Sequence, residues 1–347
     1  CQMSSMECVI AVHAGAGYQK TTKEANYKKI CMKACKKGLE VLKNNGTALD
    51  AVALATMVLE DSPLTNAGYG SNLTWNGAVE CDASIIDGSN MHYGGVGAVS
   101  GIKNPISLAK LICENQNLKM SFGRIPPCLL VGRGAHEYAI ANNIITVDPS
   151  NLISEKSKKD FVRNKYKIIN QKYSNCQTGN SRLDTVGCVG MDKFGNVAAS
   201  SSSGGILLKQ NGRVGQSALL GSGCWAQMSD DIAIAVTTSG CGEHLIKTNL
   251  AKEMSRHLFN SPCPTMAITK CFNEDFLYSP LLRNYNEKLA GALVLFKNRD
   301  CCEILSAHTT KSMCIAYATE NNKKSYVSRL ITNTLPGTSV MVQGYPL

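Results

Sequence analysis

The stretch Ser181-Arg182-Leu183-Asp184-Thr185-Val186-Gly187-Cys188-Val189 joins two unlike parts of the 347-residue chain. Before it lies a polar, basic segment, whereas the residues from Thr185 onward are apolar and β-branched, which favours a buried strand. Asp192-Lys193-Phe194-Gly195 then predicts a hairpin turn, so we expect paired strands over residues 185–191 and 196–202. The sequence around Thr185 therefore predicts a buried strand that begins abruptly after a polar connector.

The rest of the chain predicts helices and strands on both sides of this junction. A short apolar strand, Val9–Val12, should break at the glycine turn His13-Ala14-Gly15-Ala16-Gly17. Periodicity predicts helices at residues 23–43, 48–59, 106–114 and 128–141, and one ending near residue 258; it predicts further strands at residues 78–86, 91–99, 232–238, 292–296 and 313–318. This order predicts an α+β fold with two stacked sheets between helical layers, a four-layer αββα sandwich. We expect one domain over residues 1–347, with an α-segment (1–184) and a β-segment (185–347).

A basic connector of about residues 145–184 ends the α-segment. From Glu155 to Asp184 it has eight Lys or Arg against three Asp or Glu, and this surplus is half of the formal net charge of +10. Such a composition favours a solvated, flexible segment. It is also typical of a nuclear import signal that binds an import receptor, or of a contact site for acidic partners. The two interpretations are compatible.

Composition argues against several classes of protein. No apolar run reaches the roughly 18 residues of a membrane span, and residues 1–7 lack the pattern of a secretory signal. The 16 cysteines are scattered, form no C-x-x-C pair and do not combine with histidines at zinc-ligand spacing. We therefore expect reduced thiols, no metal site, no membrane partner, and a location in the nucleus and cytoplasm.

The common nucleophile motifs are absent from the sequence. There is no G-x-S-x-G elbow, Cys/His signature or H-E-x-x-H, and Gly15-Ala16-Gly17 and Gly95-Val96-Gly97 complete no nucleotide-binding loop. A threonine at the start of a strand is most often only a β-branched structural residue. The interpretation of Thr185 therefore depends on the motifs that accompany it.

Those motifs resemble the plant-type asparaginase family of N-terminal-nucleophile (Ntn) hydrolases. The similarity covers most of the chain outside the connector and residues 260–286, and within the family it is strongest to the threonine aspartase (taspase) branch. The motifs that carry it are His13-Ala14-Gly15-Ala16-Gly17, Glu60-Asp61-Ser62-Pro63-Leu64-Thr65-Asn66-Ala67-Gly68, Glu80-Cys81-Asp82-Ala83-Ser84-Ile85, Leu183-Asp184-Thr185-Val186-Gly187, Ser202-Ser203-Gly204-Gly205, Gly212-Arg213-Val214-Gly215-Gln216 and Thr238-Ser239-Gly240-Cys241-Gly242-Glu243.

The resemblance implies that the chain cuts itself between Asp184 and Thr185 and that Thr185 becomes the nucleophile. A threonine hydroxyl needs a base, and the cut frees an α-amine with a reference pKa of roughly 7.7–8.0 on the same residue. Ser203 matches the hydroxyl residue beside the nucleophile in this family, with a strand-end serine as the other interpretation. Ser239 and Gly240 match the pair that stabilises the oxyanion. Gly15 is expected near the nucleophile, where a glycine lets the backbone approach closely.

The resemblance also predicts the substrate. Arg213 matches an arginine that holds a substrate carboxylate, and a bidentate contact suits that task. Relatives that act on free asparagine have an aspartate three residues later, for the substrate amine, where this chain has Gln216. Together with Asp184 before the cut, this predicts an endopeptidase that cleaves proteins after aspartate. Lys23 is expected to assist Arg213, although a solvated lysine is an equal alternative.

Gly242 and Asn66 complete the predicted substrate-binding residues. Relatives bind sodium through backbone carbonyls of the loop that contains Asn66, so a structural sodium ion is the single cofactor considered. By resemblance, the substrates are nuclear regulatory proteins of the MLL methyltransferase and transcription factor IIA type, and the processed units form a homodimer. Two other functions stay open: an L-asparaginase or isoaspartyl peptidase of the same fold, and a weakly catalytic nuclear scaffold.

Overall fold

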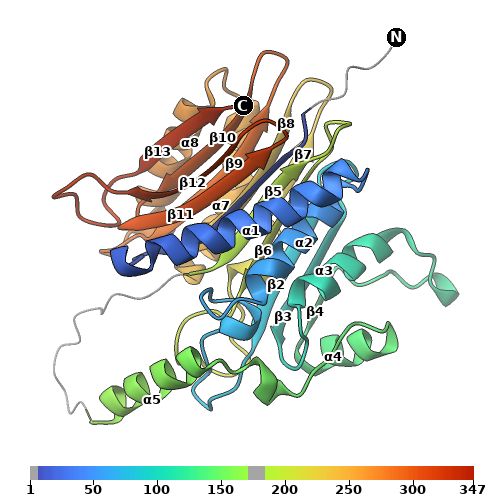
Figure 1. Cartoon of the computed structure of the whole chain (residues 1–347), viewed down its shortest axis with the longest axis vertical. Coiled ribbons are helices and arrows are strands. Elements are labelled where there is room, and N and C mark those ends of the chain that lie inside the picture. The colour runs from blue at the N-terminus through green and yellow to red at the C-terminus, as the bar shows by residue number, and fades with distance from the viewer. Residues whose placement is uncertain (1–6, 171–183) are drawn as a thin grey trace.

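The structure, a computed structural model, describes residues 7–170 and 184–347. Its first sheet contains strands from both sides of the predicted junction (Figure 1). In spatial order the strands are β12 (Lys323–Arg329), β11 (Ser312–Thr319), β1 (Val9–Gly17), β5 (Val186–Met191), β6 (Val197–Ser203), β2 (Cys81–Asp87), β3 (Tyr93–Val99) and β4 (Leu129–Val131). The β3–β4 pair is parallel and the other pairs are antiparallel. The strand that follows Thr185 is therefore central, paired with β1 on one side and β6 on the other.

A second, five-stranded antiparallel sheet lies against the first. Its strands, in spatial order, are β13 (Met341–Pro346), β10 (Cys302–His308), β9 (Ala290–Lys297), β8 (Ala233–Gly240) and β7 (Cys224–Met228). Alternate side chains of the two sheets meet in a buried core, with Val9 and Val189 from the first sheet and Leu293 and Leu295 from the second. Because side chains alternate along a strand, those on one face of each sheet fill this core. Residues just beyond a strand end lie outside that packing and can project into a site at the edge of the core.

Helices cover the outer face of each sheet. On the first sheet lie α1 (Glu24–Lys43), α2 (Ala48–Glu60) and α3 (Pro105–Glu114), and on the second lie α6 (Gly242–Thr248), α7 (Leu250–Phe259) and α8 (Pro264–Cys271). Thr47 begins α2 with a capping box, in which its hydroxyl accepts from the Asp50 N–H. The predicted αββα sandwich is confirmed.

Several predicted boundaries are wrong. β1 does not end at Val12 but continues to Gly17, because the chain absorbs an irregularity in its pairing with β11 between His13 and Ala16. The helix predicted to end near residue 258 is two helices, since Asn249 adopts a left-handed conformation with φ of 48°. Residues 129–131 form β4, so the helix predicted from residue 128 begins at Gly132 as α4 (Gly132–Ala141). The prediction also missed β7, β10, β12, β13 and α8.

The connector is partly helical where irregular structure was expected. α5 (Glu155–Asn170) follows a short 3-10 helix, Pro149–Leu152, and lies at the end of the molecule away from both termini (Figure 1). Lys165 anchors it by donating from Nζ to the Trp75 carbonyl at 2.9 Å, and most of its other side chains are at least partly exposed. Residues 171–183, the rest of the predicted connector, lie outside the described part of the chain.

Every cysteine within residues 7–170 and 184–347 is a free thiol, and nine of them are buried in the layers described above. A search of the described helices for one long and apolar enough to cross a membrane found none.

Candidate active site

Thr185 lies immediately before β5 and is almost fully buried. Because Val186 pairs with Ser202 in the neighbouring strand, the register places Thr185 beside Ser203. The Thr185 hydroxyl donates to Ser203 Oγ at 3.0 Å and accepts from the Gln216 side-chain amide at 3.2 Å. Ser203 Oγ also accepts from the Gly205 N–H at 3.0 Å. The threonine hydroxyl is therefore oriented from two sides before any reaction.

The peptide bond between Asp184 and Thr185 is held as firmly as the hydroxyl. The Asp184 carbonyl oxygen accepts from the Asn66 N–H at 3.3 Å, so a backbone donor polarises this carbonyl. On the other side Gly15, with φ of 98°, packs so closely that a Cβ atom there would lie 2.5 Å from Asp184 Cα. Only glycine fits at this position, because any side chain would displace the junction.

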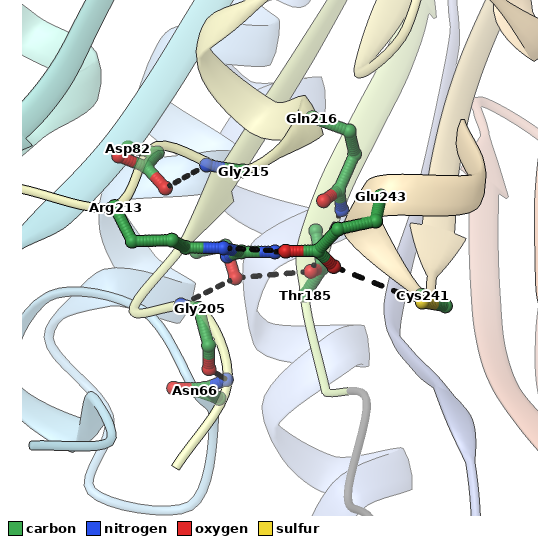
Figure 2. Close-up of polar contacts among 10 residues, drawn as sticks. Asn66, Asp82, Thr185, Gly205, Arg213, Gly215, Gln216, Cys241 and Glu243 are labelled. Atoms are coloured by element: carbon green, nitrogen blue, oxygen red, sulfur yellow. Dashed lines mark hydrogen bonds and ion pairs between the residues drawn. The ribbon is translucent and has the colours of Figure 1, made fainter. Parts of the chain in front are cut away.

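A narrow pocket opens at Thr185. Its lining comes from both sheets and from the loops after α2 and β6: Asn66, Thr185, Ser203, Gly205, Ile206, Arg213, Gln216, Gly240 and Gly242. Figure 2 shows Arg213 and Glu243 lying across the opening, with Gln216 and Thr185 beside them. The residues that can react and the residues that can bind a substrate thus face the same small space.

Arg213 supplies the pocket with a guanidinium group that already holds a carboxylate. Its Nε and Nη2 donate to the same Glu243 oxygen at 3.0 and 2.8 Å. Burial opposes ionisation of Glu243, but the attraction and hydrogen bonds of Arg213 outweigh burial and lower the pKa of Glu243. Glu243 remains about half exposed, at 47%, so it can move aside for an incoming carboxylate.

Two neighbours fix the position of the arginine. A Cβ atom on Gly242 would lie 2.5 Å from Arg213 Nη2, so the guanidinium occupies space that only a glycine leaves open. Asp82 is buried and accepts from the Gly215 N–H at 2.8 Å, which ties the loop after Arg213 to β2 (Figure 2). Burial raises the pKa of Asp82, although the Lys209 charge and two backbone donors oppose that shift.

Two further titratable groups, Glu60 and His13, are buried beside residues of the site. Glu60 ends α2, is fully buried, and accepts from the Ser202 hydroxyl at 2.6 Å. Burial raises its pKa to about 8, so Glu60 is largely protonated at neutral pH. Burial likewise lowers the pKa of His13 to about 3, and its ring makes a hydrogen bond with the Thr185 backbone. His13 is therefore neutral at physiological pH.

The structure brings together most of the residues predicted from the sequence. Those that line the pocket are Thr185, Ser203, Gly240, Arg213, Gln216, Gly242 and Asn66, while Gly15 packs against Asp184, the residue before Thr185. Ser239 is not among the lining residues; its hydroxyl accepts from the Ala16 N–H at 2.9 Å, which holds the glycine turn of β1. Lys23 is partly exposed in a short 3-10 helix, Thr21–Lys23, and is not among the described lining residues.

One buried cation near this site, Lys209, was not predicted from the sequence. Lys209 is 2% exposed, and its Nζ donates to the Glu80 carbonyl at 2.7 Å while its charge acts on Asp82. A lysine just before Gly212-Arg213 carries no signal of burial by itself, since long charged side chains are usually exposed. Lys209 also lies in a polar stretch between two strands, where an exposed lysine is expected, so the sequence did not predict its burial.

The sequence matches the family described as Asparaginase over residues 6–328. The chain belongs to this asparaginase family. Its members are Ntn hydrolases, and the two sheets with flanking helices described above are the sandwich of that family. The pocket at Thr185 is therefore the candidate active site of a hydrolase.

Curated relatives within the asparaginase family carry the name isoaspartyl peptidase/L-asparaginase. The protein of Bos taurus is 41% identical over 249 residues, which cover 71% of this chain and 75% of the relative. That of Homo sapiens is 39% identical over 254 residues, covering 73% and 77%. An isoaspartyl peptidase of Salmonella typhimurium is 32% identical over 256 residues, covering 72% and 78%.

Proposed function

We propose that this chain is a self-processing threonine hydrolase that cuts itself between Asp184 and Thr185. The observation that carries the proposal is the geometry of that bond. The Asn66 N–H points at the Asp184 carbonyl oxygen, while the Thr185 hydroxyl next to this carbonyl is bonded to Ser203. A polarised carbonyl and an oriented hydroxyl are the two elements that an internal acyl shift needs.

In the proposed reaction the Thr185 Oγ attacks the Asp184 carbonyl carbon, and negative charge develops on the carbonyl oxygen at the Asn66 N–H. The hydroxyl proton passes by way of Ser203, which accepts it and gives up its own, to the Thr185 nitrogen as the C–N bond breaks. The product is an ester between Asp184 and Thr185 Oγ, which water hydrolyses. The free α-amine of Thr185 is then the base for later turnovers, because a part of it is neutral near physiological pH.

For the substrate, we propose peptide bonds that follow an aspartate. The chain's own junction has Asp184 before the cut, and Arg213 is a guanidinium that can exchange its Glu243 partner for a substrate carboxylate. Gln216 faces Thr185 with a neutral amide, which offers no charge to bind a free substrate ammonium group. A substrate whose amine is already part of a peptide bond suits such a pocket.

The second candidate is the hydrolysis of isoaspartyl peptides or asparagine. It is favoured by the names of the relatives that are 39% and 41% identical to this chain. The aligned residues cover about three quarters of the length of each of these relatives. Both candidates use Thr185 and Arg213 in the same way. They differ in whether the substrate presents a free amine beside its carboxylate.

One assay separates the two candidates. The processed protein is offered a peptide with an internal aspartate, an isoaspartyl dipeptide and L-asparagine, with Thr185→Ala as the inactive control. We expect cleavage of the aspartyl peptide, and a Gln216→Asp variant that loses it while gaining activity on the isoaspartyl dipeptide. Hydrolysis of only the two small substrates by the unaltered protein would establish the second candidate.

Glu243→Gln tests how Arg213 is used. Because the variant removes the competing charge but keeps a similar side-chain volume, we expect a lower KM for a carboxylate-bearing substrate with little change in kcat. Arg213→Met should instead raise KM strongly. An unchanged KM in both variants would remove Arg213 from substrate binding.

A structural sodium ion and the partners also remain proposals. We propose a sodium ion bound by backbone carbonyl oxygens of the loop that carries Asn66, because such oxygens are the ligands that a hard cation takes. We propose in addition nuclear regulatory proteins as substrates, an import receptor as a partner of the basic connector, and a homodimer of processed units.

A further inference from the structure

A second cluster of reactive side chains lies in the outer helical layer, on the far side of β8 from the inter-sheet core. His257 on α7, Cys271 at the end of α8, and Asp275 on the following π-helix (Phe272–Leu277) each offer one donor atom, and these atoms all lie within 4.8 Å of one another. Imidazole, thiolate and carboxylate are the donors that zinc prefers. The sequence analysis expected no metal site, because these residues have none of the familiar zinc spacings.

The backbone around the cluster favours metal binding. Cys271 and Asp275 are four residues apart across the junction of an α-helix with a π-helix, and π-helical turns are frequent at functional sites. Glu253 and His257 are likewise four residues apart on α7, so each helix presents two donors on one face. His257, Cys271 and Asp275 thus come together from adjacent helices, and Glu253 lies one turn before His257 on α7.

The polar contacts within the cluster are those of a site in its proton-bound form. His257 Nε2 lies 2.6 Å from Asp275 Oδ2, so a proton sits between two metal donors. The Cys271 thiol is fully buried, and the described residues give it no hydrogen-bond partner. Cys271 packs in the apolar core of this layer, and its sulfur lies within 4.8 Å of the donor atoms of His257 and Asp275.

Arg256 occupies the open side of the cluster. Its Nε donates to Glu253 at 2.6 Å, and its Nη2 lies 3.5 Å from Asp275 and 3.3 Å from His257 Nε2. The guanidinium therefore neutralises the same two carboxylates that a cation would bind. Its side chain is 55% exposed and can swing into solvent, which opens an entry path past Asp275.

We propose that His257, Cys271 and Asp275 bind a zinc ion, with Glu253 or water as the fourth ligand and Arg256 as the group that the ion displaces. On binding, the proton on His257 Nε2 and the thiol proton of Cys271 leave to solvent, and the metal takes their place between the same donors. The ion joins α7 to α8 and the π-helix, so it stabilises the outer layer of the second sheet. This site is separate from the Thr185 pocket and does not depend on its function.

Cobalt(II) titration of the full, metal-stripped chain tests the proposal, because a thiolate ligand gives a near-ultraviolet charge-transfer band. We expect one cobalt per chain with this band, displaced by zinc, and zinc should raise the melting temperature. Cys271→Ser should abolish the band, and His257→Gln should weaken zinc binding at least about tenfold. Cys263→Ser, at the residue that precedes α8 and lies outside the cluster, is the matched control and should bind as the unaltered chain does.

Arg256→Gln provides a readout that a purely structural cluster would not produce. Because it removes the competing cation, zinc should bind more tightly than to the unaltered chain. If Cys271→Ser fails to fold by circular dichroism, His257→Gln and Asp275→Asn decide the question. No charge-transfer band in the unaltered chain, or a band that persists in all three ligand variants, would overturn the proposal.

Discussion

The strand pair at the junction and the helix that leads toward it differ sharply, although they are neighbours in the chain. β5 is buried along its whole length and paired on both sides, and Thr185 before it makes hydrogen bonds to two side chains. α5 is mostly exposed and is anchored to the fold by a few contacts, such as the one from Lys165 to Trp75. The sheets therefore position Thr185, while α5 contributes mainly exposed, charged surface.

If the sheets position the nucleophile, the largest effect should come from a change that disturbs the junction itself. Gly15→Ala places a Cβ atom 2.5 Å from Asp184 Cα at a residue with φ of 98°, so we expect loss of self-cleavage and a destabilisation of several kcal/mol. Cleavage is followed by gel electrophoresis and stability by urea unfolding. Gly132→Ala is the matched control, because Gly132 also has a positive φ, of 51°, but open space around it. Equal effects of the two variants would show that backbone strain, and not contact with Asp184, is responsible.

The next largest effect is expected from Glu60, the buried carboxylic acid that accepts a hydrogen bond from Ser202. The pKa of Glu60 is about 8 in the folded chain against an ordinary 4.5, so the folded state retains a proton that the unfolded state has lost between these values. Stability should therefore fall as pH rises from about 4.5 to 8, by several kcal/mol in order of magnitude. Urea unfolding at pH 5 and pH 8 measures the fall, and Glu60→Gln should flatten it. A variant with the same pH slope as the unaltered chain would contradict the role of Glu60.

A smaller effect is expected from the acceptor of the threonine hydroxyl. Ser203→Ala removes the oxygen 3.0 Å from Thr185 Oγ, which should slow self-cleavage by about tenfold, or about 1.4 kcal/mol in activation free energy. The rate is measured on freshly translated protein by the appearance of the smaller fragment. Ser239→Ala makes a useful comparison, because the Ser239 hydroxyl accepts from the Ala16 N–H. A rate for Ser203→Ala equal to that of the unaltered chain would assign the proton acceptor elsewhere.

The smallest effect should come from the connector. Lys158, Lys159 and Lys167 are exposed on α5, so replacing all three by glutamine should leave both stability and self-cleavage within experimental error. Nuclear accumulation of a fluorescent fusion is the property that we expect to change. A clear loss of self-cleavage in this triple variant would break the contrast between the two regions.

The sequence predicted those parts of the molecule that depend on local pattern. The strands around Thr185 and helices α1 and α2 were found within a few residues, because apolar periodicity and caps are local properties. The edge strands β12 and β13 were missed because their exposed faces lack a continuous apolar alternation. The left-handed Asn249 and the irregular end of β1 also depend on tertiary contacts that no local pattern reports.

For the site, motifs identified the residues but not how they act. Thr185, Ser203 and Arg213 were singled out because each lies in a motif that resembles the family, and these motifs follow one another in the order typical of it. They did not indicate that Glu243 neutralises Arg213, because such pairing depends on how β8 and the loop before η6 (Gln216–Ala218) meet in space. The polarising contact from Asn66 is made by a backbone N–H, which has no side-chain signature at all.

Intact-mass analysis of the unaltered chain beside Thr185→Ala tests the central claim most directly. The account predicts two fragments for the unaltered chain, the second beginning at Thr185, and one folded, uncut chain for the variant. A folded, unaltered chain that stays intact after prolonged incubation, or a variant that is still cut between Asp184 and residue 185, would contradict it.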